Sequence, residues 1–171
     1  MFALTPNFTD PPDPNFRPPI SRCQQAPTAA MPTRSRFSSA VVLDTNIVLD
    51  AFVFNDPAAR PLQQALATHQ LHWIATKAMR DELTRVLTYP KVTPRMAFYQ
   101  VSAAHVLAQF DGQATLVDTA PKASATCKDP DDQKFIDLAV AHRALLLSKD
   151  KAVLCMKKRL LALYVQAQEA L

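Results

Sequence analysis

The sequence predicts an α/β protein in which a mostly parallel sheet is covered by helices on both faces. From Ala40 onward, short apolar runs typical of strands alternate with longer runs that have helical periodicity. Several strand-like runs are continuously apolar, such as VVL at residues 41–43, which favours strands buried on both faces. A chain of 171 residues is long enough for one domain of ordinary size with a proper core.

The expected strands and helices follow one another in a regular order. Strands are predicted near residues 40–44, 71–75, 114–117, 144–148 and 162–165. Helices are predicted near residues 45–54, 62–69, 77–88, 94–110 and 130–142, with a short one near residues 151–158. Strands that are separated by helices in this way are joined by right-handed crossovers, and the crossovers place them in one parallel sheet.

Residues 1–39 differ in composition from the rest of the chain. Eight of the fourteen prolines fall in this segment, which has no sustained apolar period. Such a segment buries too little apolar surface to offset the entropy lost on ordering, so we expect it to be disordered. We expect the folded domain to span residues 40–171. A competing interpretation is that translation starts at Met31, in which case residues 1–30 are absent from the protein.

Composition narrows the class of protein without deciding it. The net charge is +4, and residues 1–39 and 40–171 each carry +2, which is too weak a bias to indicate nucleic-acid binding. Cys23, Cys127 and Cys155 stand far apart, which argues against a disulfide scaffold or a thiolate zinc site. No apolar run is long enough to span a membrane, and the N-terminus lacks a secretory signal. A cytoplasmic protein is therefore expected.

Two aspartates lie at or just after the carboxyl ends of predicted strands. Asp44 ends the strand at 40–44, and Asp150 comes two residues after the strand at 144–148. In open parallel sheets, sites form at the carboxyl ends of the strands, near a change in strand order. Because ionised carboxylates are costly to bury without compensation, we expect Asp44 and Asp150 to lie at one edge of the sheet and to share a partner.

Helical periodicity adds Glu82 to these acids. Within the predicted helix 77–88 the apolar stripe consists of Met79, Leu83, Val86 and Leu87. Glu82 lies three residues after Met79 and therefore on this stripe, whereas Asp81 points about 100° away from it. An acid on the buried face of a helix needs a partner, so Glu82 is a candidate site residue.

The segment KDPDDQKF adds a fourth acid. Asp129 followed by Pro130 predicts an N-cap with proline at the first helical position. Asp132 then falls on the core-facing side of the helix, whereas Asp137 is expected to face solvent. A structural interpretation of Asp132 stays open, because acids in a first helical turn often only complement the helix dipole, by about 0.3–1 kcal/mol.

Four acids are thus expected to converge, namely Asp44, Glu82, Asp132 and Asp150. Two unit charges 4 Å apart repel by about 4 kcal/mol at an effective dielectric constant near 20. The cluster would therefore raise the pKa values of its members or recruit a cation. Oxygen ligands alone suit Mg²⁺ or Mn²⁺ rather than zinc.

These motifs give the chain a resemblance to the PIN domain family, a metal-dependent nuclease fold, over about residues 40–166. The chain looks most similar to the VapC-like branch of toxins from toxin–antitoxin pairs. The shared motifs stand here as DTN at residues 44–46, EL at 82–83, DPDDQKF at 129–135 and SKD at 148–150. Relatives commonly have GDKDL where this chain has KDKAV, so Ala152 replaces a second acid. The resemblance implies a three-layer α/β/α sandwich around a five-stranded parallel sheet.

The resemblance also assigns roles to individual residues. It implies that Asp44, Glu82, Asp132 and Asp150 are both the catalytic and the metal-binding residues of the site. It further implies that Thr45 and Asn46 orient the first aspartate, and that Ser148 supplies a hydroxyl near the last one. One or two Mg²⁺ or Mn²⁺ ions would then activate a water for attack on RNA.

Substrate and partners follow from the same resemblance. Lys134, Lys149 and Lys151 flank the acids and are candidates for contacting RNA phosphates, although runs of lysine are more often solvated surface. The family also implies an antitoxin protein as partner and a homodimer or larger oligomer, without a membrane. Two other classes stay open: a non-catalytic module of the same fold that binds RNA or protein, and a receiver- or phosphatase-like domain with Asp44 as phosphate acceptor.

Overall fold

The computed structural model describes residues 39–171 of the chain, and the folded part is built around five strands. The strands are β1 (Ser39–Leu43), β2 (Leu71–Thr76), β3 (Ala114–Val117), β4 (Leu145–Leu147) and β5 (Ala167–Gln168). The expected disorder of residues 1–39 lies outside the described residues except for Ser39, which belongs to β1 instead.

Helices fill the connections between the strands. They are α1 (Thr45–Phe52), η1 (Pro57–Ala59), α2 (Arg60–Ala67), α3 (Lys77–Val86), α4 (Thr93–Phe98), α5 (Ala103–Gln113), α6 (Gln133–His142), α7 (Lys151–Leu154) and α8 (Lys157–Leu161). Within residues 39–171, no helix combines the length and apolar character needed to cross a membrane.

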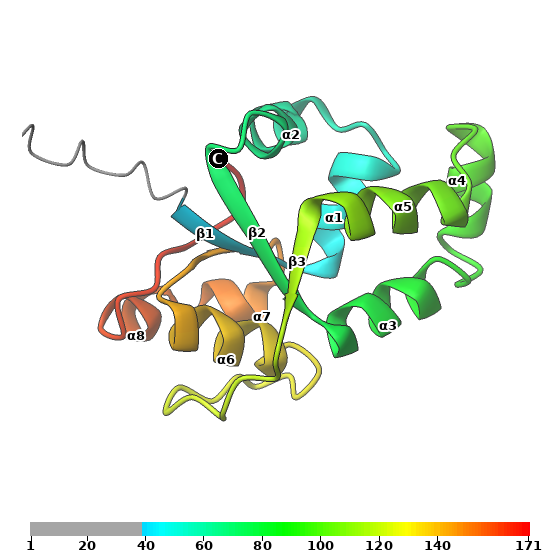
Figure 1. The fold of residues 1–171 in the computed structure, drawn as a ribbon. Coiled ribbons are helices and arrows are strands. Elements are labelled where there is room, and N and C mark those ends of the chain that lie inside the picture. The colour runs from blue at the N-terminus through cyan, green and yellow to red at the C-terminus, as the bar shows by residue number, and fades with distance from the viewer. Residues whose placement is uncertain (1–38) are drawn as a thin grey trace, which may run out of the picture. The chain divides into compact units, whose positions relative to one another are not determined.

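The sheet has the strand order β3-β2-β1-β4-β5, and every neighbouring pair is parallel. The chain moves from β1 through β2 to β3 with its crossover helices on one face of the sheet. It then passes to β4 and β5 with α6, α7 and α8 on the other face (Figure 1). This arrangement confirms the predicted three-layer fold. The direction of winding changes between β1 and β4, which is where ligands bind in sheets of this kind.

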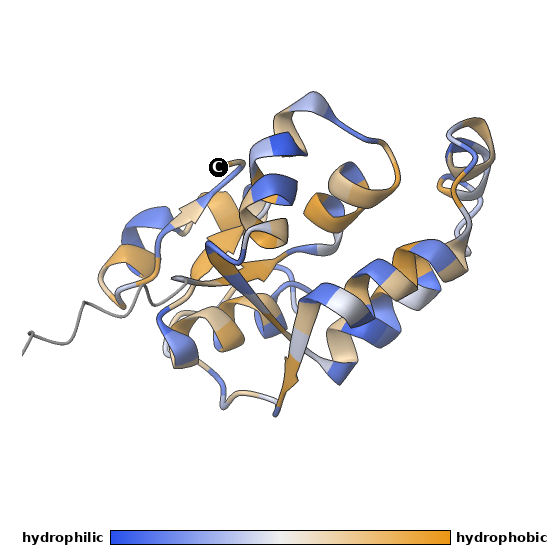
Figure 2. Ribbon diagram, turned by 45° about the horizontal axis from the view of Figure 1, so that its top comes forward, coloured by the Kyte–Doolittle hydropathy of each residue, from blue (hydrophilic) through white to orange (hydrophobic). Residues whose placement is uncertain are grey.

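The core lies on both faces of the central strands. Val41, Val42 and Leu43 of β1 are buried, because β1 is covered by helices on both sides. Figure 2 shows the hydrophobic colouring concentrated on the central strands, with hydrophilic residues on the outer sides of the helices. Trp73 and Phe135 are fully buried core residues.

The fifth strand was predicted in the wrong place. Residues 162–165 close the end of α8, where Tyr164 has a positive φ of 62°. The Val165 N–H donates to the Leu160 carbonyl over 2.9 Å, and Val165 itself is buried. This is the geometry of a helix C-cap in which an apolar residue after the cap packs back on the helix. The apolar run ALYV therefore imitates a strand, and β5 follows two residues later.

Two predicted helices also begin or end at other residues. The helix expected at residues 94–110 is divided into α4 and α5, because Gln100 has a positive φ of 55° and Ser102 caps α5 by accepting the His105 N–H over 3.1 Å. The helix expected at 130–142 begins at Gln133. Its first turn is replaced by a tighter turn in which the Asp129 side chain accepts the Asp131 N–H over 2.9 Å.

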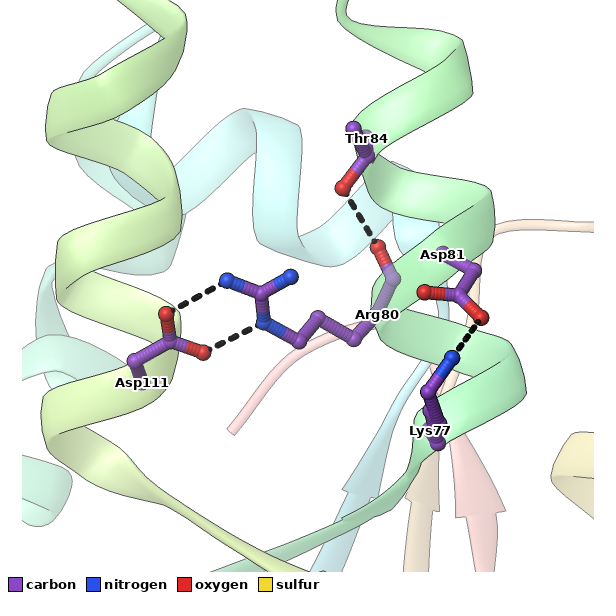
Figure 3. Close-up of polar contacts among 5 residues, drawn as sticks. All are labelled: Lys77, Arg80, Asp81, Thr84 and Asp111. Atoms are coloured by element: carbon purple, nitrogen blue, oxygen red, sulfur yellow. Dashed lines mark hydrogen bonds and ion pairs between the residues drawn. The ribbon is translucent and has the colours of Figure 1, made fainter.

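Helices α3 and α5 are joined by an ion pair on the surface. The Arg80 guanidinium donates to both carboxylate oxygens of Asp111, each over 2.6 Å, while Lys77 pairs with Asp81 along the same helix (Figure 3). The arginine holds the pKa of Asp111 below its usual value. Both pairs are exposed to solvent, so each contributes little to the stability of the protein.

Candidate functional site

The site begins where β1 and β4 end side by side. Leu43 is paired in register with Leu147, so the residues that follow, Asp44 and Ser148, are neighbours. The Asp44 N–H continues the ladder by donating to the Leu147 carbonyl over 2.9 Å. Asp44 is only 3% exposed and Ser148 is 0% exposed, and the Ser148 hydroxyl donates to Asp44 Oδ2 over 2.6 Å.

Asp150 forms a hydrogen bond with the same serine. Its N–H donates to Ser148 Oγ over 3.0 Å, so one hydroxyl links the first and the last acid of the predicted quartet. The Asp150 carboxylate caps the short helix α7 by accepting the Ala152 N–H over 2.6 Å. Ala152 therefore contributes its backbone N–H to the site.

Glu82 reaches the site from α3. The Thr45 hydroxyl donates to Glu82 Oε1 over 2.8 Å, and the Lys134 ammonium forms an ion pair with Glu82 Oε2. Asp81 pairs with Lys77 on the outer face of the helix, as helical periodicity predicted. The Thr45 side chain thus contacts Glu82, and the role of Thr45 in orienting Asp44 stays a prediction. The side chain of Asn46 is exposed.

Asp132 lies at the N-cap position of α6, without a capping hydrogen bond from its side chain. Its Oδ2 atom is buried and has no hydrogen-bond partner among residues 39–171. The pKa of Asp132 is raised to about 7, mainly by burial and in addition by the negative charges of Asp44, Asp150 and Asp129. Asp132 is therefore close enough to Asp44 and Asp150 for the three charges to act on one another.

The same repulsion acts on Asp44. Its pKa is raised above the ordinary value mainly by burial, and the charge of Glu82 adds to that effect. Hydrogen bonds from Ser148 and from the backbone of Asn46 and Thr45 oppose the shift by stabilising the ionised form. All four acids predicted from the sequence are thus brought together at the carboxyl end of β1.

The acidic side chains at the site are of the chemical type that binds a hard divalent cation. As they are placed, no three acidic, histidine or cysteine side chains within residues 39–171 meet closely enough to hold a metal ion. The donors at the site are carboxylate oxygens, and Asp132 Oδ2 is buried without a hydrogen-bond partner in the described part of the chain. Carboxylate oxygens are the ligands that Mg²⁺ and Mn²⁺ prefer.

The three lysines proposed as RNA contacts lie in different surroundings. The Lys149 ammonium pairs with Asp50 Oδ2 over 2.6 Å and with Asp56 Oδ2 over 3.2 Å, which raises its pKa. Lys134 is held at Glu82 by its ion pair. Lys151 is exposed at the first position of α7, next to Asp150.

Two residues of α6 hold the loop before Asp132, a role that was not predicted from the sequence. Asp137 was expected to face solvent but is half-buried, and its Oδ1 accepts the Ala123 N–H over 2.8 Å. Gln133 donates to the same oxygen over 2.6 Å and accepts the Cys127 N–H over 2.7 Å. The available signal was their spacing of four residues, which places both side chains on one face of α6.

Replacing Gln133 with alanine is expected to destabilise the protein by about 1–2 kcal/mol, because the Cys127 N–H loses its acceptor. Chemical denaturation measures the loss, and hydrogen exchange of the Ala123 and Cys127 amides shows where it occurs. Gln64→Ala, on the exposed side of α2, is the control and should change neither. Unchanged protection of both amides would show that Gln133 does not hold this loop.

Comparison with known proteins agrees with the fold. The chain matches the family model of the PIN domain over residues 40–152. Among solved structures it resembles the crystal structure of VapBC2 from Rickettsia felis bound to a DNA fragment from their promoter. The TM-score is 0.52 with 15% identity, over 75% of this chain and 97% of that chain. At this identity the likeness shows the fold alone. No curated protein matches the chain.

The fold and site define an α/β protein with acidic side chains at the carboxyl ends of β1 and β4, where the strand order of the parallel sheet reverses. The match to the family model covers most of the folded part, and the chain belongs to the PIN domain family. The resemblance inferred from the four motifs is thereby confirmed.

Proposed function

We propose that this protein is a metal-dependent endoribonuclease. The observation that carries the proposal is the buried Oδ2 of Asp132, which has no hydrogen-bond partner among residues 39–171. Burial and the neighbouring acids also raise the pKa of Asp132 to about 7. Like charges that are gathered at a partly buried site favour the binding of a cation. A divalent ion would satisfy the free oxygen and lower the repulsion at the same time.

Asp44, Glu82, Asp132 and Asp150 are the residues that would hold Mg²⁺ or Mn²⁺. Such an ion, when bound, supplies an activated water and stabilises the charge that develops on a phosphodiester during hydrolysis. Ser148 fixes the rotamer of Asp44, and Thr45 fixes that of Glu82. Lys151 is the lysine best placed to contact an RNA phosphate, since it is exposed beside Asp150, whereas Lys149 is engaged by Asp50 and Asp56.

We further propose that the protein is the toxin of a toxin–antitoxin pair, that it is cytoplasmic and that it forms a homodimer or larger oligomer. The VapC-like motifs and the likeness to VapBC2 support an antitoxin partner. Expression of the chain should then arrest growth, and a small reading frame beside its gene should relieve the arrest. Growth that is unaffected by the expressed protein would contradict the toxin role without bearing on the nuclease.

Purified protein is expected to cleave RNA in the presence of Mn²⁺ or Mg²⁺ and to stop when EDTA is added. Denaturing gels of end-labelled RNA measure the products, and restoring activity with excess Mn²⁺ controls for irreversible damage by the chelator. Cleavage that persists in EDTA would contradict a metal-dependent mechanism. RNA binding without cleavage, under all metal conditions, would favour the non-catalytic module instead.

A further inference from the structure

Lys134 places a cation against the acidic site from within the protein itself. Its ammonium group contacts Glu82 Oε2 and the Asp131 carbonyl, and it lies 4.9 Å from the centre of the Phe135 ring. The side chain is 24% exposed and that of Glu82 is 16% exposed. Water therefore screens this pair less than it screens a surface pair, and the ammonium is held by three groups at once.

Each carboxylate oxygen of Glu82 already has a partner in this arrangement. Oε1 accepts the Thr45 hydroxyl over 2.8 Å and Oε2 is occupied by Lys134. The situation differs at Asp132, where Oδ2 is buried without a partner among the described residues. An ion that enters the site thus finds an available oxygen on Asp132 but has to compete for Glu82.

We propose that Lys134 is the internal counter-cation of the metal-free site and that a divalent ion binds by displacing it from Glu82. This inference rests on the proposed function, because it concerns the same metal site. It assigns a role to an ammonium group that is held between an acidic side chain of α3 and the first turn before α6. Lys134 is thus a positioning residue that sets how much divalent metal the protein needs.

The chain offers a matched pair on the same helix as Glu82. Lys77 pairs with Asp81 over 2.9 Å, but the two side chains are 83% and 58% exposed and lie on the outer face of α3. Lys77→Met therefore removes the same net charge as Lys134→Met without touching the site. Lys134→Arg keeps a cation at the site and controls for the loss of the side chain.

Titration calorimetry of the full chain with Mn²⁺, after removal of bound metal with EDTA, measures the effect. Lys134→Met is expected to lower the Kd for Mn²⁺ about tenfold, which is about 1.4 kcal/mol, because the ion no longer competes with an ammonium group. Lys77→Met and Lys134→Arg should stay within about twofold of the wild type. In EDTA, Lys134→Met should also melt at a lower temperature than Lys77→Met, since its acids have lost their counter-cation.

The outcomes separate this inference from the nuclease proposal. A Lys134→Met variant that binds Mn²⁺ as tightly as the wild type, or more weakly, would overturn the role of Lys134 and leave the metal site standing. Absence of Mn²⁺ binding in both the wild type and Lys134→Met would overturn the metal site itself, and the inference with it. Lys134→Gln repeats the measurement with a polar side chain if the methionine variant does not fold.

Discussion

Replacing Asp44 with asparagine is expected to lower the rate of RNA cleavage at least about a thousandfold. Asp44 lies at the centre of the site. It accepts a hydrogen bond from Ser148 and interacts electrostatically with both Glu82 and Asp132. Removing one anionic ligand from a hydrolytic metal site takes away several kcal/mol of transition-state stabilisation, and about 4 kcal/mol corresponds to about a thousandfold in rate.

The Asp44→Asn variant should nevertheless fold. An asparagine oxygen can still accept the Ser148 hydroxyl, and the N–H of residue 44 still donates to the Leu147 carbonyl. Burial already opposes the charge of Asp44, so a neutral side chain relieves an unfavourable contribution. Thermal unfolding should therefore show a midpoint at or above that of the wild type.

Asp81→Asn is the matched control for this experiment, since it makes the same chemical change on the outer face of α3. It should cleave RNA at the wild-type rate. Undiminished cleavage by a folded Asp44→Asn variant would remove Asp44 from the proposed site. A variant that has lost both its activity and its thermal transition would show instead that Asp44 is required for folding.

Replacing Asp132 with asparagine is expected to stabilise the metal-free protein at pH 8 by about 1–2 kcal/mol while abolishing cleavage. The pKa of Asp132 is raised from 3.8 to about 7 by burial and by Asp44, Asp150 and Asp129, with Lys134 acting in the opposite direction. A shift of about three units would be worth about 4 kcal/mol if fully expressed. Solvent screening of this half-buried group reduces the figure to about 1–2 kcal/mol.

The sign of the pH dependence follows from the raised pKa. Between pH 3.8 and about 7 the folded protein retains a proton on Asp132 that the unfolded chain has released. The contribution of Asp132 to the free energy of unfolding should therefore be highest below about pH 4, fall as the pH rises to about 7, and change little above that. Asp44 contributes in the same direction, so the Asp132→Asn variant should keep a smaller slope rather than none.

Urea denaturation of the metal-free protein between pH 4 and pH 8 measures this dependence. Asp131→Asn, an exposed neighbour, should leave the curve unchanged. Added Mn²⁺ should raise the stability of the wild type at pH 8 and have little effect on Asp132→Asn, because a ligand stabilises only the state that binds it. Equal stability of the wild type and Asp132→Asn at pH 8 would contradict the repulsion on which the proposed function rests.

The positions of the acidic residues could be predicted from the sequence where strand direction or helical periodicity fixes them. Asp44 and Asp150 could be placed together because the carboxyl ends of parallel strands meet at one edge of a sheet. Glu82 could be placed from helical phase alone, and the same reasoning put Asp132 on the inner side of its helix although that helix begins three residues later than predicted.

The errors arose where one local pattern has two structural outcomes. The run ALYV at residues 162–165 has the composition of a strand, yet an apolar residue after a left-handed cap satisfies the end of a helix equally well. The ion-pair partners of long side chains could not be predicted from the sequence either. Nothing in the spacing of Lys134 and Glu82, or of Lys149 and Asp50, indicates that folding brings them together.

The most direct test of the central claim is anomalous scattering from crystals of the full chain soaked in Mn²⁺. The proposed function predicts a Mn²⁺ peak among the carboxylates of Asp44, Asp132 and Asp150. The displacement of Lys134 predicts that Glu82 Oε2 has turned toward the ion. Full occupancy of Mn²⁺ elsewhere, with Asp132 Oδ2 still without a partner, would contradict the assignment of these acids as a metal site.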